Sequence, residues 1–124
     1  LNGEQRRRGV ERLKVGSALL FCFPGSPTVY YGDEAGMEGF EDPFNRGTYP
    51  WGAERQDLLE RFGRLARLRH SRPSLSRGRF RWLTASGPLL AFARETEVER
   101  TVTVVNAGSE TRTLTLPWRR PGAC

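Results

Sequence analysis

Two neighbouring carboxylates, Asp33 and Glu34, follow a short run of β-branched and aromatic residues from Thr28 to Tyr31. Such residues favour a strand, and Gly32 lets the backbone turn where the strand ends. In a parallel α/β barrel, active sites are built at the carboxyl ends of the strands. Many strands end in Gly-Asp, however, so a role in a site and a purely structural role both stay open.

A long loop, residues 32–54, follows the predicted strand and holds a second group of candidate residues. Loops of this length in compact domains tend to be functional or disordered, and large apolar side chains favour a packed loop. Carboxylates beside aromatic rings also suit sugar binding, because rings stack on the apolar faces of sugars and charged groups bond the hydroxyls. A sugar site and an ordered loop pinned by its aromatic residues both remain open. The large apolar residues are Met37, Phe40, Phe44, Tyr49 and Trp51.

The residues on either side of this loop predict the elements that position it. Apolar residues recur at helical spacing over about 4–21 and again over about 55–69, and Pro73 ends the second helix. A helix that leads into a buried strand at 28–31 predicts a parallel α/β unit. One parallel strand cannot form a sheet, so its neighbours must come from another chain or from sequence before Leu1. We therefore expect this chain to be a piece of a larger protein.

Beyond Ser74 the apolar period changes from helical to alternating, which predicts a separate β module. Short alternating runs over 79–83, 89–94, 101–105 and 111–116 are separated by turn-forming segments. Four strands at this spacing predict an antiparallel sheet or half of a sandwich. We expect a domain boundary that divides the chain into 1–73 and 74–124.

Composition argues against several classes of function. The chain has 124 residues and a net charge of +6, which arginine carries almost alone because Lys14 is the single lysine. The arginines are spread beside Asp and Glu, and Arg6 to Arg8 form the only dense basic cluster, so we expect no nucleic-acid partner. No apolar run approaches the length of a membrane span, so we expect no membrane partner.

Cysteine and histidine do not have the spacing of a metal centre. Cys22 lies in an apolar run, where a free cysteine is usually a small core residue, and Cys124 is the last residue. Neither has a partner at zinc-ligand spacing. His70, the only histidine, lies near the end of a predicted helix and fits a helix-terminal or surface role.

One long segment closely resembles the eighth-strand motif of the α-amylase family of glycoside hydrolases. It is Pro24-Gly25-Ser26-Pro27-Thr28-Val29-Tyr30-Tyr31-Gly32-Asp33-Glu34-Ala35-Gly36-Met37. The continuation resembles the neopullulanase, cyclomaltodextrinase and maltogenic amylase branch, through Asp42-Pro43-Phe44-Asn45-Arg46 and Tyr49-Pro50-Trp51. The resemblance runs essentially end to end. It implies the last strand and flanking helices of a (β/α)₈ barrel, followed by an antiparallel β-sandwich C-terminal domain.

The resemblance also implies a chemistry. Enzymes of this family cleave α-glucosidic bonds with retention, here in maltodextrins, cyclodextrins or pullulan, through a carboxylate nucleophile and a carboxylic acid. These two groups and a third, stabilising acid would lie before Leu1, so we expect no catalytic residue in this chain and no activity from it alone. The implied partners are the α-glucan and the rest of the barrel. No cofactor or metal is expected here, although calcium could serve the full-length parent. The expected location is cytoplasmic, with secretion left open.

The same resemblance assigns substrate-binding residues in the loop. The spacing of Arg46 and Trp51 matches a family pattern in which the arginine pairs with an upstream aspartate at the bottom of the subsite for the terminal glucose. We therefore expect Arg46, Asp42 and Trp51 to bind substrate. Close relatives often carry a second arginine where this chain has Gly47, which departs from the pattern. A loop-bracing ion pair is the alternative role of Arg46.

Asp33 and Glu34 do not match the catalytic positions of the family. We expect them to hold the top of the last strand, behind the residues that touch substrate. For the chain as a whole, the alternative is a non-catalytic sugar-binding or interaction module derived from the family.

Overall fold

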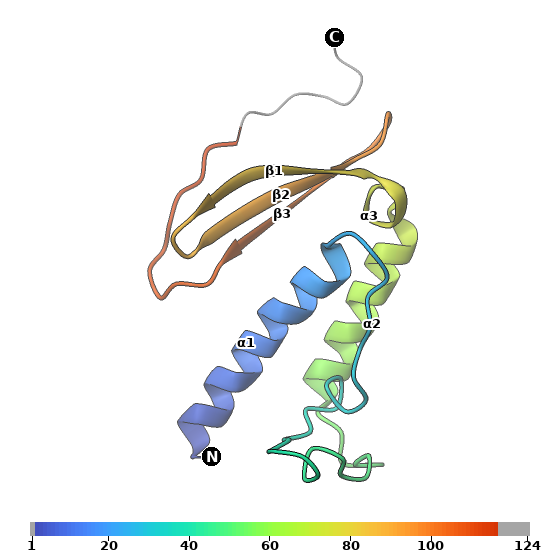
Figure 1. Ribbon diagram of the computed structural model, residues 1–124, viewed down its shortest axis with the longest axis vertical. Coiled ribbons are helices and arrows are strands. Elements are labelled where there is room, and N and C mark those ends of the chain that lie inside the picture. Colours follow the sequence, from blue (N-terminus) through green and yellow to red (C-terminus); the bar gives the residue numbers. More distant parts are fainter. Residues whose placement is uncertain (1, 117–124) are drawn as a thin grey trace.

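The computed structural model describes residues 2–116, which form two long helices with a small antiparallel sheet at one end (Figure 1). Helices α1 (Gly3–Cys22) and α2 (Gln56–Ser71) lie side by side, and the short helix α3 (Pro73–Arg77) leads into the sheet. The strands are β1 (Arg79–Ser86), β2 (Leu89–Glu95) and β3 (Arg100–Asn106). The connection between α1 and α2 leaves the end of α1 near the sheet and runs back beside α2 (Figure 1). It then forms a long loop at the end where both long helices begin, opposite the sheet.

Local sequence signals explain the bounds of the long helices. A capping box starts α1, because the side chain of Asn2 accepts from the Gln5 N–H at 2.8 Å while Gln5 accepts from the Asn2 N–H at 2.9 Å. The helix ends at Cys22, and Phe23 before Pro24 is extended. Both predicted helices are confirmed. Pro73, however, occupies the first position of α3, where proline is well tolerated, so it starts a new helix as well as ending α2.

The sheet has the order β1-β2-β3, and both pairs of strands are antiparallel. The three predicted strands from 79 to 106 are confirmed. The fourth predicted strand, 111–116, is wrong, because these residues enter no strand ladder. Its alternation reflects a local preference, whereas a strand also needs a neighbouring edge with which to pair. The remainder of the predicted β module, including Cys124, lies outside the described residues.

The predicted strand over 28–31 also does not form. Residues 28–30 have no regular secondary structure, Tyr31 already belongs to the following turn, and no backbone in the described part of the chain forms a ladder with them. The segment turns at its end, where the Asp33 N–H donates to the Tyr30 carbonyl at 3.1 Å. A parallel strand exists only through hydrogen bonds to its neighbours, so a strand-like sequence does not form a strand by itself.

The core lies where the sheet meets the carboxyl-terminal end of α1. Cys22, Leu75 and Phe92 form a buried cluster, which confirms the prediction that Cys22 is a core residue. Around this cluster the ring of Phe23 packs edge-on against Phe80 and Phe92, with centroid separations of 5.2 and 5.6 Å. The aromatic residues therefore join the end of α1 to the inner face of the sheet.

Two arginines bind the carbonyl groups at the end of α1, whose last turn carries no basic residue. Arg69 of α2 donates to the carbonyls of Phe21 at 2.7 Å and Phe23 at 3.1 Å. Arg94 of β2 is only 3% exposed and donates to the carbonyls of Cys22 at 3.4 Å and Gly78 at 3.1 Å. A helix C-terminus is electronegative and leaves carbonyls without partners, so these cations satisfy it while tying three elements together.

A buried polar cluster fixes α3 to the hairpin between β2 and β3. Ser74 is fully buried, and its hydroxyl and its N–H both donate to the Glu99 carboxylate, the N–H at 3.0 Å. Thr101 completes the cluster, with its hydroxyl oxygen 2.7 Å from that of Ser74. These hydrogen bonds replace the water that the buried serine loses on folding.

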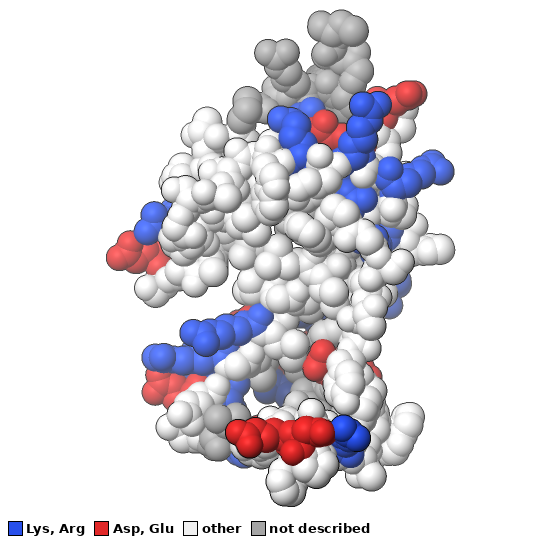
Figure 2. Space-filling model, viewed as in Figure 1, with Lys and Arg blue, Asp and Glu red and all other residues white. Residues whose placement is uncertain are grey.

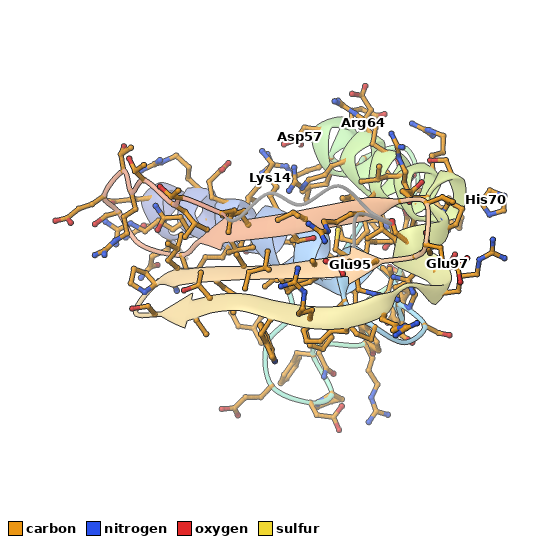
Figure 3. All side chains as sticks on the ribbon, turned by 90° about the horizontal axis from the view of Figure 1, so that it is seen from above. Lys14, Asp57, Arg64, His70, Glu95 and Glu97 are labelled. Carbon is orange, nitrogen blue, oxygen red and sulfur yellow. The ribbon has the colours of Figure 1, made fainter. Side chains whose placement is uncertain are left out.

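The charged side chains are unevenly distributed. Figure 2 shows acidic side chains gathered at the loop end, and basic side chains over the sheet end and along α1. His70 is exposed at the end of α2 and points away from the protein, which confirms its predicted surface position (Figure 3). None of the helices described by the structure combines the length and the apolar character needed to cross a membrane.

Replacing Arg94 with methionine should weaken the attachment of the sheet. The change leaves the buried carbonyl of Cys22 and the partly buried carbonyl of Gly78 without their donor, and we expect the free energy of unfolding to fall by about 2 kcal/mol. Arg79→Met, at an exposed position of β1, is the matched control and should change it by less than about 0.5 kcal/mol. Urea denaturation measures both. Equal stability of the two variants would contradict the role assigned to Arg94.

The Ser74–Glu99 cluster should make stability depend on pH. Hydrogen bonds from Ser74 lower the pKa of Glu99 in the folded protein below the ordinary glutamate value of 4.5. The ionised Glu99 carboxylate therefore makes its full contribution to the free energy of unfolding above pH 4.5. This contribution is lost as the pH falls through the lowered pKa. Urea denaturation should show that the wild type loses more stability on acidification than Glu99→Gln does. Glu97→Gln, a change at an exposed neighbour, should behave like the wild type.

Candidate functional site

The turn after Tyr31 places the two carboxylates. Gly32 and Gly36 adopt φ angles of +94° and +75°, which L side chains rarely accept, and the Met37 N–H donates to the Gly32 carbonyl at 2.9 Å. Glu34 folds back and accepts from the Gly32 N–H at 3.1 Å. Partial burial, and then the neighbouring Glu34, raise the pKa of Asp33. Glu34 thus braces this turn, while Asp33 keeps a half-buried carboxyl beside it.

Arg46 and Asp42 form a bidentate ion pair within the loop. Arg46 Nη2 lies 2.8 Å from Asp42 Oδ2, and Arg46 Nε lies 2.8 Å from Asp42 Oδ1. The backbone of this short turn is itself bonded, since the Phe44 N–H donates to the Glu41 carbonyl at 2.8 Å. The side chains of Arg46 and Asp42 are 65% and 58% exposed, so donors and acceptors face solvent in a fixed arrangement.

Trp51 projects from the loop with 83% of its surface exposed. Its ring contacts Tyr49 at a centroid separation of 4.6 Å and an angle of 49°. Burial, and then the Glu34 carboxylate, raise the pKa of Tyr49, which connects this aromatic pair to the turn around Asp33. Such a ring offers a free face on which a sugar could stack.

Long-range polar contacts hold the loop in place. Tyr31 Oη donates to the Gly47 carbonyl at 3.0 Å, and Arg6 of α1 forms an ion pair with Glu38 at 2.7 Å. Of the loop's large apolar residues, Phe40, Phe44 and Trp51 do not pin it, because they are 64%, 75% and 83% exposed, whereas Met37 and Tyr49 are half-buried. Sequence reasoning missed Arg6, Glu38 and the Tyr31 hydroxyl, and no local pattern marks partners so far apart in sequence.

The structure brings some of the predicted residues together and leaves others apart. Asp42 and Arg46 form one pair, and Asp33 and Glu34 lie in the turn that begins the loop. No hydrogen bond, ion pair or ring contact joins Trp51 to Asp42 or Arg46 among residues 2–116. The same range contains no group of three or more His, Cys, Asp or Glu residues that could hold a metal ion. The described arrangement offers binding groups for a polar ligand.

Known proteins resemble this chain both in sequence and in structure. No family model matches the chain. An amylopullulanase of Thermoanaerobacter thermohydrosulfuricus is 44% identical over 85 residues, which are 68% of this chain and 6% of the relative. Neopullulanase 2 of Thermoactinomyces vulgaris is 37% identical over 114 residues, which are 87% of this chain and 20% of the relative.

The solved structures give the same result. An α-amylase from Geobacillus thermoleovorans in complex with acarbose superposes with a TM-score of 0.81 and 33% identity, over 86% of this chain and 24% of that one. An Anoxybacillus α-amylase has a TM-score of 0.79 and 39% identity, over 83% of this chain and 23% of that one. The chain therefore belongs to the α-amylase family, and it spans about a fifth or less of the curated relatives it matches. The resemblance seen in the sequence is confirmed.

Tyr31→Phe should loosen the loop without unfolding the protein. The variant removes the hydrogen bond to the Gly47 carbonyl, which is worth about 1 kcal/mol. Amide hydrogen exchange over 41–47 should become several-fold faster, while exchange in α1 and α2 stays unchanged. Tyr30→Phe, a change at an adjacent exposed tyrosine, is the matched control. Unchanged exchange in the loop of the Tyr31 variant would show that the other contacts suffice.

Proposed function

We propose that this chain is the C-terminal part of a retaining α-glucosidic-bond hydrolase that acts on maltodextrins, cyclodextrins or pullulan. Residues 1–73 would complete its (β/α)₈ barrel, and residues 74–124 would form its C-terminal β-sandwich domain. The relatives named neopullulanase, cyclomaltodextrinase and amylopullulanase support this substrate class. A matched structure from Arthrobacter globiformis, a cyclic α-maltosyl-(1→6)-maltose hydrolase in complex with that sugar, supports it as well.

The unpaired segment 28–31 supports a place in a barrel wall. Its backbone forms no ladder within residues 2–116, and it joins the end of α1 to the loop that precedes α2. This is the connectivity of a parallel strand between two barrel helices. The remaining strands of the parent protein would supply its hydrogen-bonding neighbours.

The observation that supports the proposed site most directly is the bidentate ion pair of Asp42 and Arg46 on an exposed loop. Its carboxylate offers acceptors and its guanidinium offers donors, a combination suited to the neighbouring hydroxyls of a glucose unit. The exposed ring of Trp51 would stack on a sugar face. Asp33 and Glu34 would hold the end of the last strand and thereby position the loop.

Catalysis would depend on acids supplied by the rest of the barrel. A retaining glycosidase needs a nucleophile and an acid on opposite sides of the scissile bond. No residue of this chain matches those family positions, so the chain by itself should not hydrolyse maltotriose or pullulan. Its contribution would be to bind and orient the sugar.

A chimaera tests this function directly. The matched segment of the Geobacillus thermoleovorans α-amylase would be replaced by this chain, which superposes on it over 86% of this chain's length. The chimaera should hydrolyse maltodextrin, and Arg46→Ala should lower its kcat/KM roughly ten- to a hundredfold, the equivalent of one or two charge-assisted hydrogen bonds. Arg112→Ala, which removes an exposed arginine beyond β3, is the matched control and should leave kcat/KM unchanged.

Two outcomes would contradict the proposal. A folded chimaera without hydrolytic activity would favour a non-catalytic module, above all if the chain alone bound maltotriose. Hydrolysis that is insensitive to Arg46→Ala would leave the enzyme class intact but would remove the Asp42–Arg46 pair from the substrate site.

A further inference from the structure

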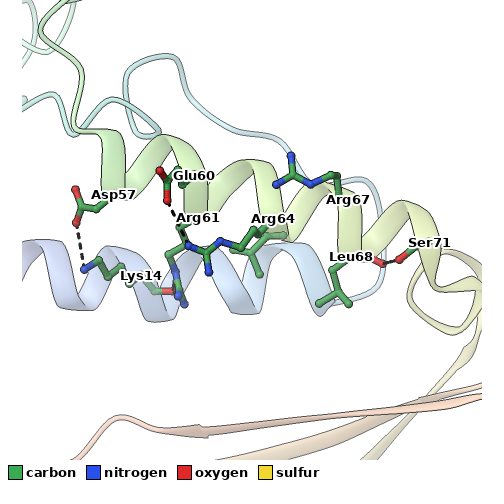
Figure 4. Close-up of a pocket in the computed structure, with 9 residues that line it drawn as sticks. Lys14, Asp57, Glu60, Arg61, Arg64, Arg67, Leu68 and Ser71 are labelled. Carbon is green, nitrogen blue, oxygen red and sulfur yellow. Dashed lines mark hydrogen bonds and ion pairs between the residues drawn. The ribbon is translucent and has the colours of Figure 1, made fainter.

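A groove of about 720 Å³ lies along α2, beside Lys14 of α1 (Figure 4). It opens on a face of α2 that carries Asp57, Arg64 and Leu68, whereas the buried residues Leu58 and Phe62 lie on another face. The residues of the Asp42–Arg46 site take no part in it. The groove is therefore separate from the proposed sugar site.

The lining of this groove carries more positive than negative charge. Lys14, Arg61, Arg64 and Arg67 are basic, and two residues, Asp57 and Glu60, are acidic. Both acidic side chains are already engaged: Asp57 lies 3.3 Å from Lys14 and 3.0 Å from Arg55, and Glu60 lies 3.4 Å from Arg64 (Figures 3 and 4).

Two of the groove's arginines have no carboxylate partner in the described chain. Arg61 donates from Nε and Nη2 to the Lys14 carbonyl and from Nε to the Ser17 hydroxyl, so it braces α2 against α1 while its charge stays without a carboxylate. Arg67 forms no ion pair with any of residues 2–116. An anionic partner would therefore find guanidinium groups whose charge no carboxylate neutralises.

The groove also presents apolar surface between these charges. Leu65 is half-buried, and Leu68 is 39% exposed although it is a large apolar residue on a helix. The two residues are three positions apart and so lie on adjoining parts of one helix face. Apolar surface bordered by positive charge is the complement of an acidic amphipathic segment.

We propose that this groove docks an acidic amphipathic helix of a partner protein. From Asp57 to Ser71 the groove follows α2 for roughly 21 Å, the length of about four helical turns. Leucine-like side chains of the partner would contact Leu65 and Leu68, and its carboxylates would pair with Arg67 and, in competition with Glu60, with Arg64. The excess positive charge along this length is what favours an acidic helix over a neutral one.

Fluorescence anisotropy with a designed peptide tests the proposal. The probe is a labelled helical peptide of about sixteen residues with leucine on one face and glutamate elsewhere. Its control is a scrambled peptide of the same composition. The protein is used as the full chain in three forms: wild type, Arg64→Glu/Arg67→Glu, and Arg7→Glu/Arg12→Glu. The last pair changes exposed arginines of α1 outside the groove and alters the net charge by the same amount.

The wild type should bind the amphipathic peptide saturably and more weakly at high salt, and the scrambled peptide poorly. The groove variant should bind about tenfold more weakly or worse, and the α1 variant within about twofold of wild type. Circular dichroism checks folding, and Leu68→Asn, which keeps the charge, should also weaken binding. No binding to wild type, or equal losses in both charge variants, would overturn the proposal.

Discussion

The end of α1 is the point on which the rest of this structure depends. A helix C-terminus leaves its last carbonyls without intrahelical partners, and here the helix supplies no cation of its own. Arg69 from α2 donates to the carbonyls of Phe21 and Phe23, and Arg94 from β2 donates to that of Cys22 between them. The ring of Phe23 packs against Phe92 of the sheet. One electrostatic requirement therefore joins elements that are about fifty and seventy residues away in sequence.

The sheet end and the loop end of the molecule are therefore held together in different ways. At the sheet end, buried hydrogen bonds and packed rings make a rigid junction. At the other end, the loop is held by a few polar contacts, such as Tyr31 to Gly47 and Arg6 to Glu38, and it presents its charged pair and its aromatic rings to solvent. Recognition groups on a loop positioned by a rigid scaffold are a common arrangement in proteins that bind small polar ligands.

Two exposed features of the chain are suited to contacts with other surfaces. Segment 28–31 has no neighbouring strand within residues 2–116, and the groove along α2 combines apolar side chains with arginines that lack carboxylate partners there. Water solvates these exposed groups in this chain, and a partner that displaces the water must supply hydrogen bonds and opposite charge in its place. In the proposed parent, the barrel would supply the hydrogen bonds to segment 28–31.

The sequence by itself determined the two long helices, three strands, the buried Cys22 and the family, because each depends on short-range periodicity or on a long continuous motif. It could not determine that 28–31 and 111–116 fail to become strands, since a strand requires a partner as well as a preference. Asp42 and Arg46 are four residues apart, so a local sequence pattern can predict that they form a pair. The arginines that bind the end of α1, Arg69 and Arg94, and the contacts that hold the loop were decided only by tertiary structure, because only the folded chain brings residues distant in the sequence to these carbonyls and carboxylates.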